Sequence, residues 1–157
     1  MTKQLWLGVG VLVGGLLMFG TLWLTKKPTA EKAATPPENT IGFVEIPITD
    51  TVASKAFYEA LFNVRLAPRV VDSLNMYFFP MNPLGYGSAA ALVYGHTYQP
   101  SKQGAVVYFT VKNIDSTVQK ALQIGATLNY PITQVDGTMK VAELIDVAGN
   151  RIGLQQP

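Results

Sequence analysis

Few residues of this chain have the type and spacing that chemistry requires. Glu45 is the best candidate, because it is an isolated carboxylate in the largely apolar run Phe43–Thr49. It could act as a general base or accept a hydrogen bond from a ligand. The alternative is a partly solvated carboxylate that pairs with a neighbouring Lys or Arg. His96 is the only histidine and lies in a polar stretch, so we interpret it as a surface residue.

Several reaction types are excluded because the sequence lacks the residue types or motifs that they need. The chain has no cysteine, which excludes disulfides, thiolate nucleophiles and thiolate-bound metals. The Gly85–Gly87 stretch is not a phosphate cradle, because no helix start with Lys-Ser or Lys-Thr follows it. None of three candidate serines lies in a nucleophile elbow, so a Ser/His/Asp triad is not supported. These serines are Ser54, Ser88 and Ser101.

The net charge of +2 is unevenly distributed. Residues 1–40 contain four lysines and two glutamates, whereas residues 41–157 contain eight basic and eight acidic side chains. A domain without surplus positive charge lacks the electrostatic footprint of a nucleic-acid-binding protein. We therefore expect no nucleic acid among the partners of this protein.

The elements that must position these residues begin with Ile41–Phe62, which predicts a strand, a tight turn and an amphipathic helix. Asp50 or Thr51 is suited to cap the helix, since either side chain can accept bonds from free backbone N–H groups. Helical spacing predicts a buried face made of Val52, Ala56, Phe57, Ala60 and Leu61. Further strands are expected at Val64–Leu66, Met76–Phe79 and Ala89–Tyr94.

A second copy of the same order starts near Ala105. Ala105–Val111 predicts a strand, and Asp115 is expected to cap a helix that runs through Ile124 and stops at Gly125. Core residues of this helix are expected at Val118, Ala121 and Leu122. Three more strands are expected near Thr127–Tyr130, Thr138–Ile145 and Arg151–Leu154.

The two copies align at a constant offset. Phe43–Asn63 aligns with Val106–Ala126, and Asp50 then matches Asn113. Such repetition implies two modules that pack around a shared core. The predicted fold class is α+β, with two βαβββ modules of paired curved sheets. We place this domain at residues 41–157, with modules at about 41–96 and 105–155.

The N-terminal segment predicts a membrane anchor. Leu5–Leu24 contains no charged residue and is long enough to span a hydrocarbon core of about 30 Å, after a short tail at residues 1–4. The alternative is a cleaved signal peptide, whose apolar core is usually about 7–15 residues long. Gly10 and Gly14 form a small-residue pair that lets another transmembrane helix pack closely.

Residues 25–40 are polar, contain three prolines and predict a semi-rigid linker. The anchor and linker would hold the domain at a lipid bilayer, or in a complex with other membrane proteins. Lysines on both sides leave the orientation nearly balanced. The short positive tail favours the exported, periplasmic side of a bacterial inner membrane.

Residues 41–155 resemble the vicinal oxygen chelate superfamily, which includes glyoxalases, extradiol dioxygenases and bleomycin-resistance proteins. The likeness is to its glyoxalase-like branch and rests on short motifs. These are Glu45-Ile-Pro47, Phe57-Tyr58, Ala91-Leu-Val93, Val107-Tyr108-Phe109 and Gly149-Asn150-Arg151-Ile152-Gly153-Leu154. The resemblance implies paired sheets that curve into a cup whose floor holds a metal or a small ligand.

In metal-dependent members of this family, the first strand of each module offers a His or a similar ligand, and the last strand offers a Glu. The corresponding residues here are Phe43, Val106 and Gly153, and the matching strand of the first module contains Ala89–Ala91. A divalent catalytic site needs three or four converging N or O ligands. Because the sequence departs from the family's pattern at these positions, we expect a domain without a metal or another cofactor.

Four residues are candidates for the ligand cup: Glu45, Tyr108, Arg151 and Gly153. Tyr108 occupies the position of Glu45 in the second module, and either faces it across a pseudo-twofold axis or packs in the core. Arg151 shares a strand face with Gly153, and either reaches into the cup or points outward. Gly153 and Ala89–Ala91 would leave the cup open to an apolar ligand.

Three hypotheses for the function follow. The first is a membrane-anchored, metal-free module for binding or assembly, such as an accessory subunit of a larger membrane complex. The second is an enzyme of the glyoxalase type, a lyase or isomerase, that uses Glu45 as its base. The third is a protein that sequesters a small molecule, as the resistance members of the family do.

Overall fold

The computed structural model describes residues 41–85 and 87–157, and these residues repeat the order strand, helix and three strands. The first module consists of β1 (Phe43–Ile48), α1 (Thr51–Phe62), β2 (Ala67–Val71), β3 (Leu74–Phe78) and β4 (Ala89–Tyr94). The second consists of β5 (Val107–Thr110), α2 (Ile114–Gln123), β6 (Thr127–Asp136), β7 (Met139–Ile145) and β8 (Arg151–Gln156).

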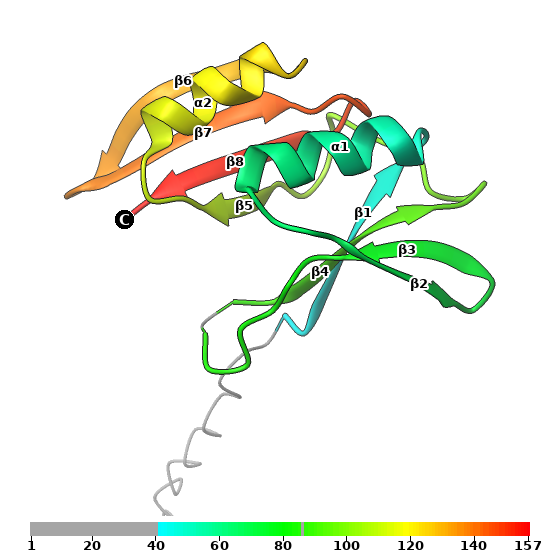
Figure 1. Ribbon diagram of the computed structural model, residues 1–157. Coiled ribbons are helices and arrows are strands. Elements are labelled where there is room, and N and C mark those ends of the chain that lie inside the picture. Colours follow the sequence, from blue (N-terminus) through cyan, green and yellow to red (C-terminus); the bar gives the residue numbers. More distant parts are fainter. Residues whose placement is uncertain (1–40, 86) are drawn as a thin grey trace, which may run out of the picture. The chain divides into compact units, whose positions relative to one another are not determined.

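Each module builds one four-stranded sheet, and Figure 1 shows the two sheets with their helices. The strand orders are β1-β4-β3-β2 and β5-β8-β7-β6. In each sheet the first strand pairs in parallel with the last strand of the module, and the remaining pairs are antiparallel. The predicted α+β class with two βαβββ modules is confirmed.

Helix α1 begins after Asp50, whose carboxylate accepts hydrogen bonds from the backbone N–H groups of Val52 and Ala53, both at 2.9 Å. It ends at Asn63, which has a left-handed backbone with φ of 53°. The predicted buried face is wrong in part. Val52 is 78% exposed, and the buried residues of the helix are Ser54, Phe57, Tyr58 and Leu61.

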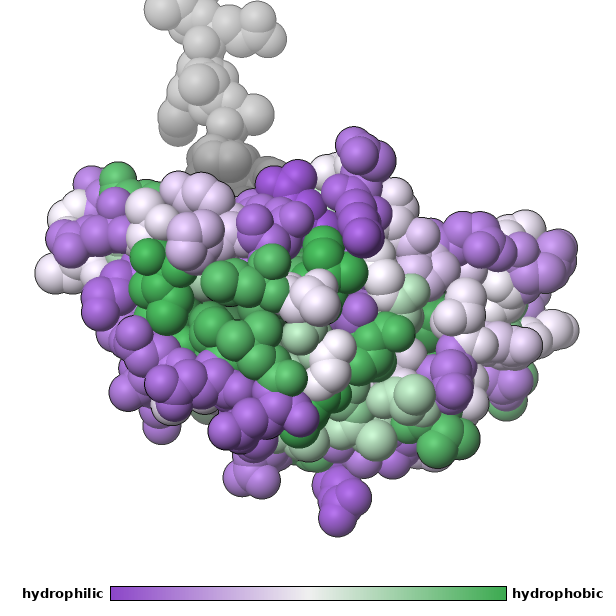
Figure 2. Space-filling view, turned by 90° about the horizontal axis from the view of Figure 1, so that it is seen from above, coloured by the Kyte–Doolittle hydropathy of each residue, from purple (hydrophilic) through white to green (hydrophobic). Residues whose placement is uncertain are grey.

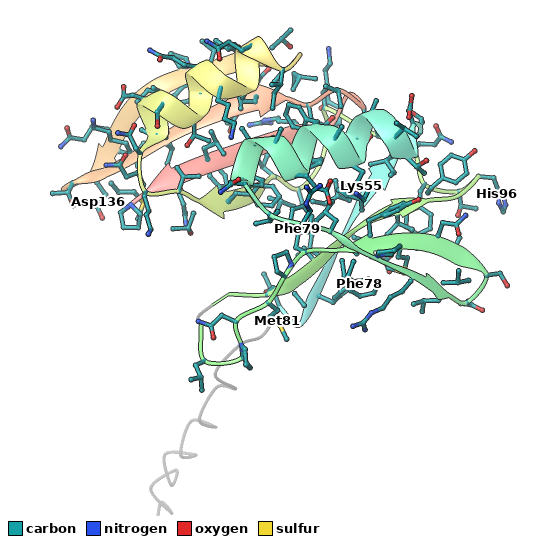
Figure 3. The ribbon with its side chains drawn as sticks, in the orientation of Figure 1. Lys55, Phe78, Phe79, Met81, His96 and Asp136 are labelled. Atoms are coloured by element: carbon teal, nitrogen blue, oxygen red, sulfur yellow. The ribbon has the colours of Figure 1, made fainter. Side chains whose placement is uncertain are left out.

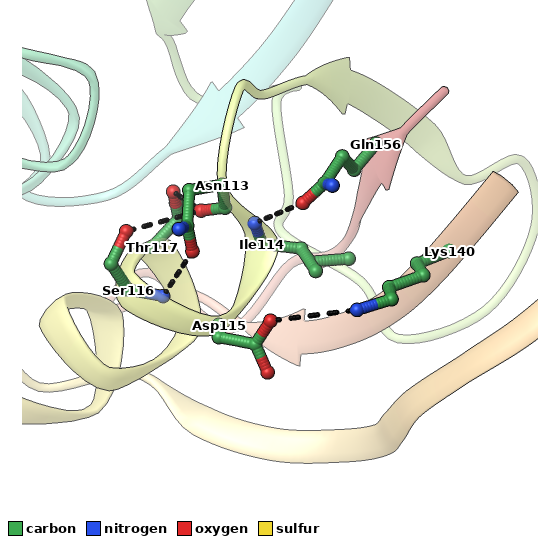
Figure 4. Close-up of polar contacts among 7 residues, drawn as sticks. All are labelled: Asn113, Ile114, Asp115, Ser116, Thr117, Lys140 and Gln156. Carbon is green, nitrogen blue, oxygen red and sulfur yellow. Dashed lines mark hydrogen bonds and ion pairs between the residues drawn. The ribbon is translucent and has the colours of Figure 1, made fainter. Parts of the chain in front are cut away.

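Helix α2 begins after Asn113, not at Asp115 as the sequence suggested (Figure 4). The Asn113 side chain accepts a hydrogen bond from the backbone N–H of Ser116 at 2.9 Å. The backbone N–H of Ile114 donates to the Gln156 side chain at 2.8 Å, which ties α2 to the end of β8. Asp115 instead lies in the first turn, where its carboxylate is 3.8 Å from the Lys140 amine.

Two strand predictions are corrected. Val64–Leu66 is not a strand, and the strand of that region is β2 (Ala67–Val71), all of whose residues are exposed. An edge strand without a buried face lacks the apolar alternation that identifies strands in a sequence. The sixth strand is longer than expected, because β6 continues to Asp136 along its partner β7.

One hydrophobic cluster contains residues of both modules and forms the shared core. The buried ring of Tyr58 contacts the partly buried rings of Phe62, Phe79 and Phe109, which pack against this cluster, and the ring centroids of the four lie 4.7–6.4 Å apart. Phe79 belongs to this core, whereas Phe78 packs with Met76 on the other face of the first sheet (Figure 3). Each sheet therefore has one face toward the core and one outer face.

The predictions for residues 1–40 lie outside the described residues. These are the tail, the transmembrane helix with Gly10 and Gly14, and the linker. Among the residues that the structure describes, no helix is long and apolar enough to cross a membrane.

Candidate functional site

A polar cluster lies on the outer face of the second sheet, with the buried carboxylate of Glu143 at its centre. Arg151 donates to it twice, from Nε and Nη2, both at 2.8 Å. The Tyr108 hydroxyl and the Asn129 amide each donate at 3.0 Å. Each carboxylate oxygen therefore accepts two hydrogen bonds, and the contact with Arg151 is a bidentate ion pair.

Strand periodicity explains this placement. Successive side chains of a strand point to opposite faces, so Ala142 and Leu144 enter the core while Glu143 points outward. In the sheet register Glu143 lies opposite Gly153 on β8, and Gly153 lies opposite Tyr108 on β5. The three residues thus form one row across three neighbouring strands.

The cluster holds its charges in fixed states. The hydrogen bonds from Arg151 are the main cause that lowers the pKa of Glu143 to about 2, and those from Tyr108 and Asn129 add to it. The same contact with Glu143 raises the pKa of Arg151. Burial, followed by its hydrogen bond to Glu143, raises the pKa of the Tyr108 hydroxyl. Glu143 is therefore a carboxylate, and Tyr108 a neutral donor, at any ordinary pH.

Gly153 makes room for the Tyr108 ring. A Cβ atom at Gly153 would lie 2.4–2.6 Å from the ring atoms Cδ1, Cε1 and Cγ of Tyr108, far inside van der Waals contact. The space left by the missing glutamate is thus filled by an aromatic ring. On the first sheet, Ala91 is fully buried under a small apolar cluster with Met76 and Phe78. The floor of the ligand cup, which was expected to be open at Gly153 and at Ala89–Ala91, is therefore closed at both positions.

The structure separates Glu45 from Tyr108. Glu45 is exposed on β1, and its carboxylate accepts a hydrogen bond from the Tyr98 hydroxyl at 2.6 Å. This bond is the main cause that raises the pKa of Tyr98. Tyr108 makes its hydrogen bond with Glu143 instead. Glu45 and Tyr108 therefore do not pair with each other, as the pseudo-twofold symmetry had suggested, and each is hydrogen-bonded to another residue.

Glu45 and Arg151 nevertheless line the same pocket. It has a volume of about 240 Å³ and lies where β1 of the first module meets the start of β8 of the second. Its polar lining comes from Glu45, Arg151, Asn150, Gln99, Ser101 and Gln103. Of the four candidate residues, the structure therefore brings three together around Glu143, and Glu45 shares a pocket with one of these three, Arg151.

A buried hydrogen-bond network of Asn150, Asp146 and Tyr58 holds the two sides of the pocket in place. The Asn150 amide nitrogen donates to the backbone oxygen of Pro47 at 2.8 Å and to Asp146 at 3.0 Å. The Tyr58 hydroxyl donates to Asp146 at 2.6 Å from helix α1, and its pKa is raised by burial and by that carboxylate. These bonds link the first module to the last turn of the second.

The residues at the family's metal positions do not fit a metal. Phe43, Val106 and Gly153 have no side-chain donor atom, and Glu143 is already saturated with hydrogen bonds. In residues 41–85 and 87–157, no group of three or more His, Cys, Asp or Glu side chains could hold a metal ion. His96 is exposed in the loop after β4 (Figure 3).

Sequence reasoning missed Glu143, Asn129 and Tyr98. Glu143 did carry a signal, because it is a lone acid in the strand Met139–Ile145 and is flanked by Ala142 and Leu144. The contacts of Asn129 with Glu143 and of Tyr98 with Glu45 carried no signal, since the partners lie 14 and 53 residues apart in the chain. Only the pairing of strands and the loop after β4 bring them into contact.

The Glyoxalase/Bleomycin resistance protein/Dioxygenase superfamily matches residues 40–154 of the chain. No curated protein matches the chain. A glyoxalase/bleomycin resistance protein/dioxygenase family enzyme from Burkholderia phytofirmans PsJN has a similar structure, with a TM-score of 0.57 and 19% identity over 73% of this chain and 96% of that one.

Two further solved structures have the same fold. The antibiotic binding protein TnmS3 from Streptomyces sp. CB03234 has a TM-score of 0.57 and 20% identity, over 76% of this chain and 96% of that one. The fosfomycin resistance protein FosX from Listeria monocytogenes has a TM-score of 0.56 and 14% identity, over 76% and 91%. By its matching sequence over most of its length and by its two βαβββ modules, the chain belongs to the glyoxalase/bleomycin resistance protein/dioxygenase superfamily.

Proposed function

We propose that this protein is a membrane-tethered, metal-free binding module, held at the bilayer by Leu5–Leu24 and acting in assembly with other membrane proteins. The observation that carries the metal-free part of the proposal is the state of Glu143. Its four hydrogen bonds leave its oxygens without capacity for a metal or a substrate proton.

The pKa of Glu143 argues against base catalysis at this place. A general base works best when its pKa lies near the operating pH. A carboxylate with a pKa of about 2 is too weak a base for this role at neutral pH. The cluster is suited to hold a rigid, polar surface, with Arg151 half-buried and Tyr108 40% exposed at its edge.

The surface of the domain also suits contact with a protein. Figure 2 shows apolar residues gathered across the middle of the face seen from above, with hydrophilic residues around them. Large exposed apolar areas with polar rims are typical of protein interaction sites. Such a face supports the assembly role, in which the anchor brings the domain to its partner within the membrane.

Extraction from the native membrane in a mild detergent tests this proposal. The full chain should purify together with other membrane proteins in a fixed ratio, and Tm should not change when a chelator is added. The Gly10→Leu/Gly14→Leu variant should lose partners that bind through the membrane segment but keep its fold. A monodisperse, lone species would contradict the assembly role, and a stoichiometric divalent ion would contradict the metal-free role.

Sequestration of a small molecule is the second candidate, and the 240 Å³ pocket between the modules favours it. The pocket combines the charged groups of Arg151 and Glu45 with side-chain amide groups, so it suits a small polar ligand. A ligand at a hundred times its Kd should stabilise the protein by about 2.7 kcal/mol. Thermal shift against a panel of antibiotics tests this candidate. The pocket variant is Gln103→Leu, and the matched control is Gln119→Leu on α2. A panel without any shift would count against sequestration.

An enzyme of the glyoxalase type remains the third candidate, with Glu45 as its base. The exposed carboxylate of Glu45 lines the pocket and has the Tyr98 hydroxyl as its partner. If this candidate is right, Glu45→Gln should abolish turnover of a small carbonyl substrate and leave Tm unchanged. Turnover that is equal in the variant and the parent would exclude Glu45 as the base.

A further inference from the structure

The loop between β3 and β4 carries large apolar side chains that are open to solvent. Leu84 is 93% exposed and Met81 is 65% exposed, and Ile41, just before β1, is 61% exposed. Figure 3 shows Met81 at the end of the domain where β1 begins, while His96 lies at the opposite end. We call Ile41, Met81 and Leu84 the apolar tip.

The apolar tip is an ordered part of the fold. The Ser88 hydroxyl donates a hydrogen bond to the backbone oxygen of Ile41, and Phe43 pairs with Ala89 at the start of the parallel strands β1 and β4. These contacts hold the end of the loop beside the start of β1. Within the loop, the Asn82 side chain accepts a hydrogen bond from the backbone N–H of Leu84 at 3.0 Å, which fixes the turn that exposes Leu84.

The charge pattern points to a lipid surface. Residues 73–101, which include the whole loop, contain no Asp, Glu, Lys or Arg. Ordinary exposed loops carry charges that keep them in water, and inserting a charged group into a bilayer is costly. A loop with exposed Leu and Met and no charge has the composition of a segment that enters the interfacial layer.

The chain before Ile41 brings a bilayer within reach. Leu5–Leu24 is the apolar segment that we propose as the anchor, and it is followed by Lys26 and Lys27, which favour anionic headgroups. Residues 25–40 span at most about 55 Å when fully extended, and much less as a coil. The first described residue after this linker, Ile41, belongs to the apolar tip.

We infer that the apolar tip inserts into the interfacial layer of the membrane in which the chain is anchored, and so orients the domain with β1 rising away from the bilayer. This inference rests on the proposed anchor. It assigns Leu84 and Met81 a role as membrane contacts, and it places the start of α1, at the other end of β1, away from the lipid. The six residues of β1 span about 20 Å, so the two ends differ clearly in depth.

Site-directed spin labelling tests the inference, and the absence of cysteine makes single labels simple to introduce. The full chain is reconstituted in liposomes of phosphatidylcholine and phosphatidylglycerol, whose anionic headgroups attract Lys26 and Lys27. One variant is Leu84→Cys. The matched control is Val52→Cys, an apolar residue that is 78% exposed at the start of α1. Collision of the label with oxygen and with a water-soluble nickel complex is measured by electron paramagnetic resonance.

At Leu84 the label should collide more often with oxygen than with the nickel complex, and at Val52 the order should be reversed. Equal ratios at the two sites would overturn the inference, even if the chain floats with the liposomes. A Leu84 label that is immobile and inaccessible to both reagents would also overturn it, because a protein contact would then cover the tip. If the chain does not float with liposomes, the proposed anchor fails, and this inference fails with it.

Discussion

The close contact between Gly153 and Tyr108 makes a quantitative prediction about the second sheet. Replacing Gly153 by Ala adds a Cβ atom that would lie 2.4–2.6 Å from three atoms of the Tyr108 ring. Ordinary carbon contacts are about 3.5–4.0 Å long, so the ring must move by about 1 Å or more. Because the ring atoms in contact include Cγ, a rotation about the ring axis does not relieve the clash, and the hydroxyl must leave Glu143.

The magnitude follows from three contributions. Overpacking usually costs about 1–3 kcal/mol. The lost hydrogen bond to a charged group costs up to about 1.5–3 kcal/mol, less here because the 40% exposed side chain of Tyr108 lets water replace it. Replacing glycine within a strand returns about 0.5–1 kcal/mol. We expect Gly153→Ala to lower the free energy of unfolding by about 1–3 kcal/mol.

A double-mutant cycle isolates the contact. In a Tyr108→Ala background the added Cβ meets no ring, so Gly153→Ala should be neutral or stabilise the protein by about 0.5–1 kcal/mol. The four proteins are compared as full chains in detergent by urea unfolding, at constant m-value. If Gly153→Ala is equally destabilising in both backgrounds, the ring over Gly153 is not the reason for the glycine.

Three further predictions use the same unfolding measurement. Tyr58→Phe removes the donor at 2.6 Å from the buried Asp146 carboxylate and should cost about 1.5–3 kcal/mol; an unchanged midpoint would contradict this. Ser54→Ala removes a buried hydroxyl without a hydrogen-bond partner and should stabilise the protein by about 1 kcal/mol, whereas a loss of stability would indicate a hidden partner. Stability should fall as the pH drops from 4.5 toward 2, because the folded pKa of Glu143 lies below its unfolded value and the stabilisation is lost on protonation. Glu143→Gln should flatten this dependence, and a slope equal to that of the parent would refute its origin in Glu143.

The repeat of the two modules was readable in the sequence because its signals are local. The constant offset aligned Asp50 with Asn113, and both residues cap their helices, although Asp115 was the cap predicted for the second helix. Capping depends on one side chain and the next three residues, so a sequence contains all of the information. Strand β4, Ala89–Tyr94, has the predicted bounds for the same reason: a short apolar run that ends at a glycine.

Other elements were decided by partners far along the chain. Strand β2 exists because it pairs with β3, although every residue of it is exposed. Helix α1 buries Tyr58 in place of Val52, since the hydroxyl of Tyr58 finds Asp146, 88 residues away, and its ring finds Phe109 of the second module. The periodicity of a helix predicts that one face is buried, but the neighbouring module selects which face.

The candidate site divides in the same way. From the sequence alone came the family, the two modules and the loss of metal ligands at Phe43, Val106 and Gly153. Only the tertiary structure made Glu143 the centre of the site, because its four hydrogen bonds come from β5, β6 and β8. Alternation along β7 determines that Glu143 points to the outer face of the sheet. The order of the strands in the sheet determines which side chains lie beside Glu143 on that face.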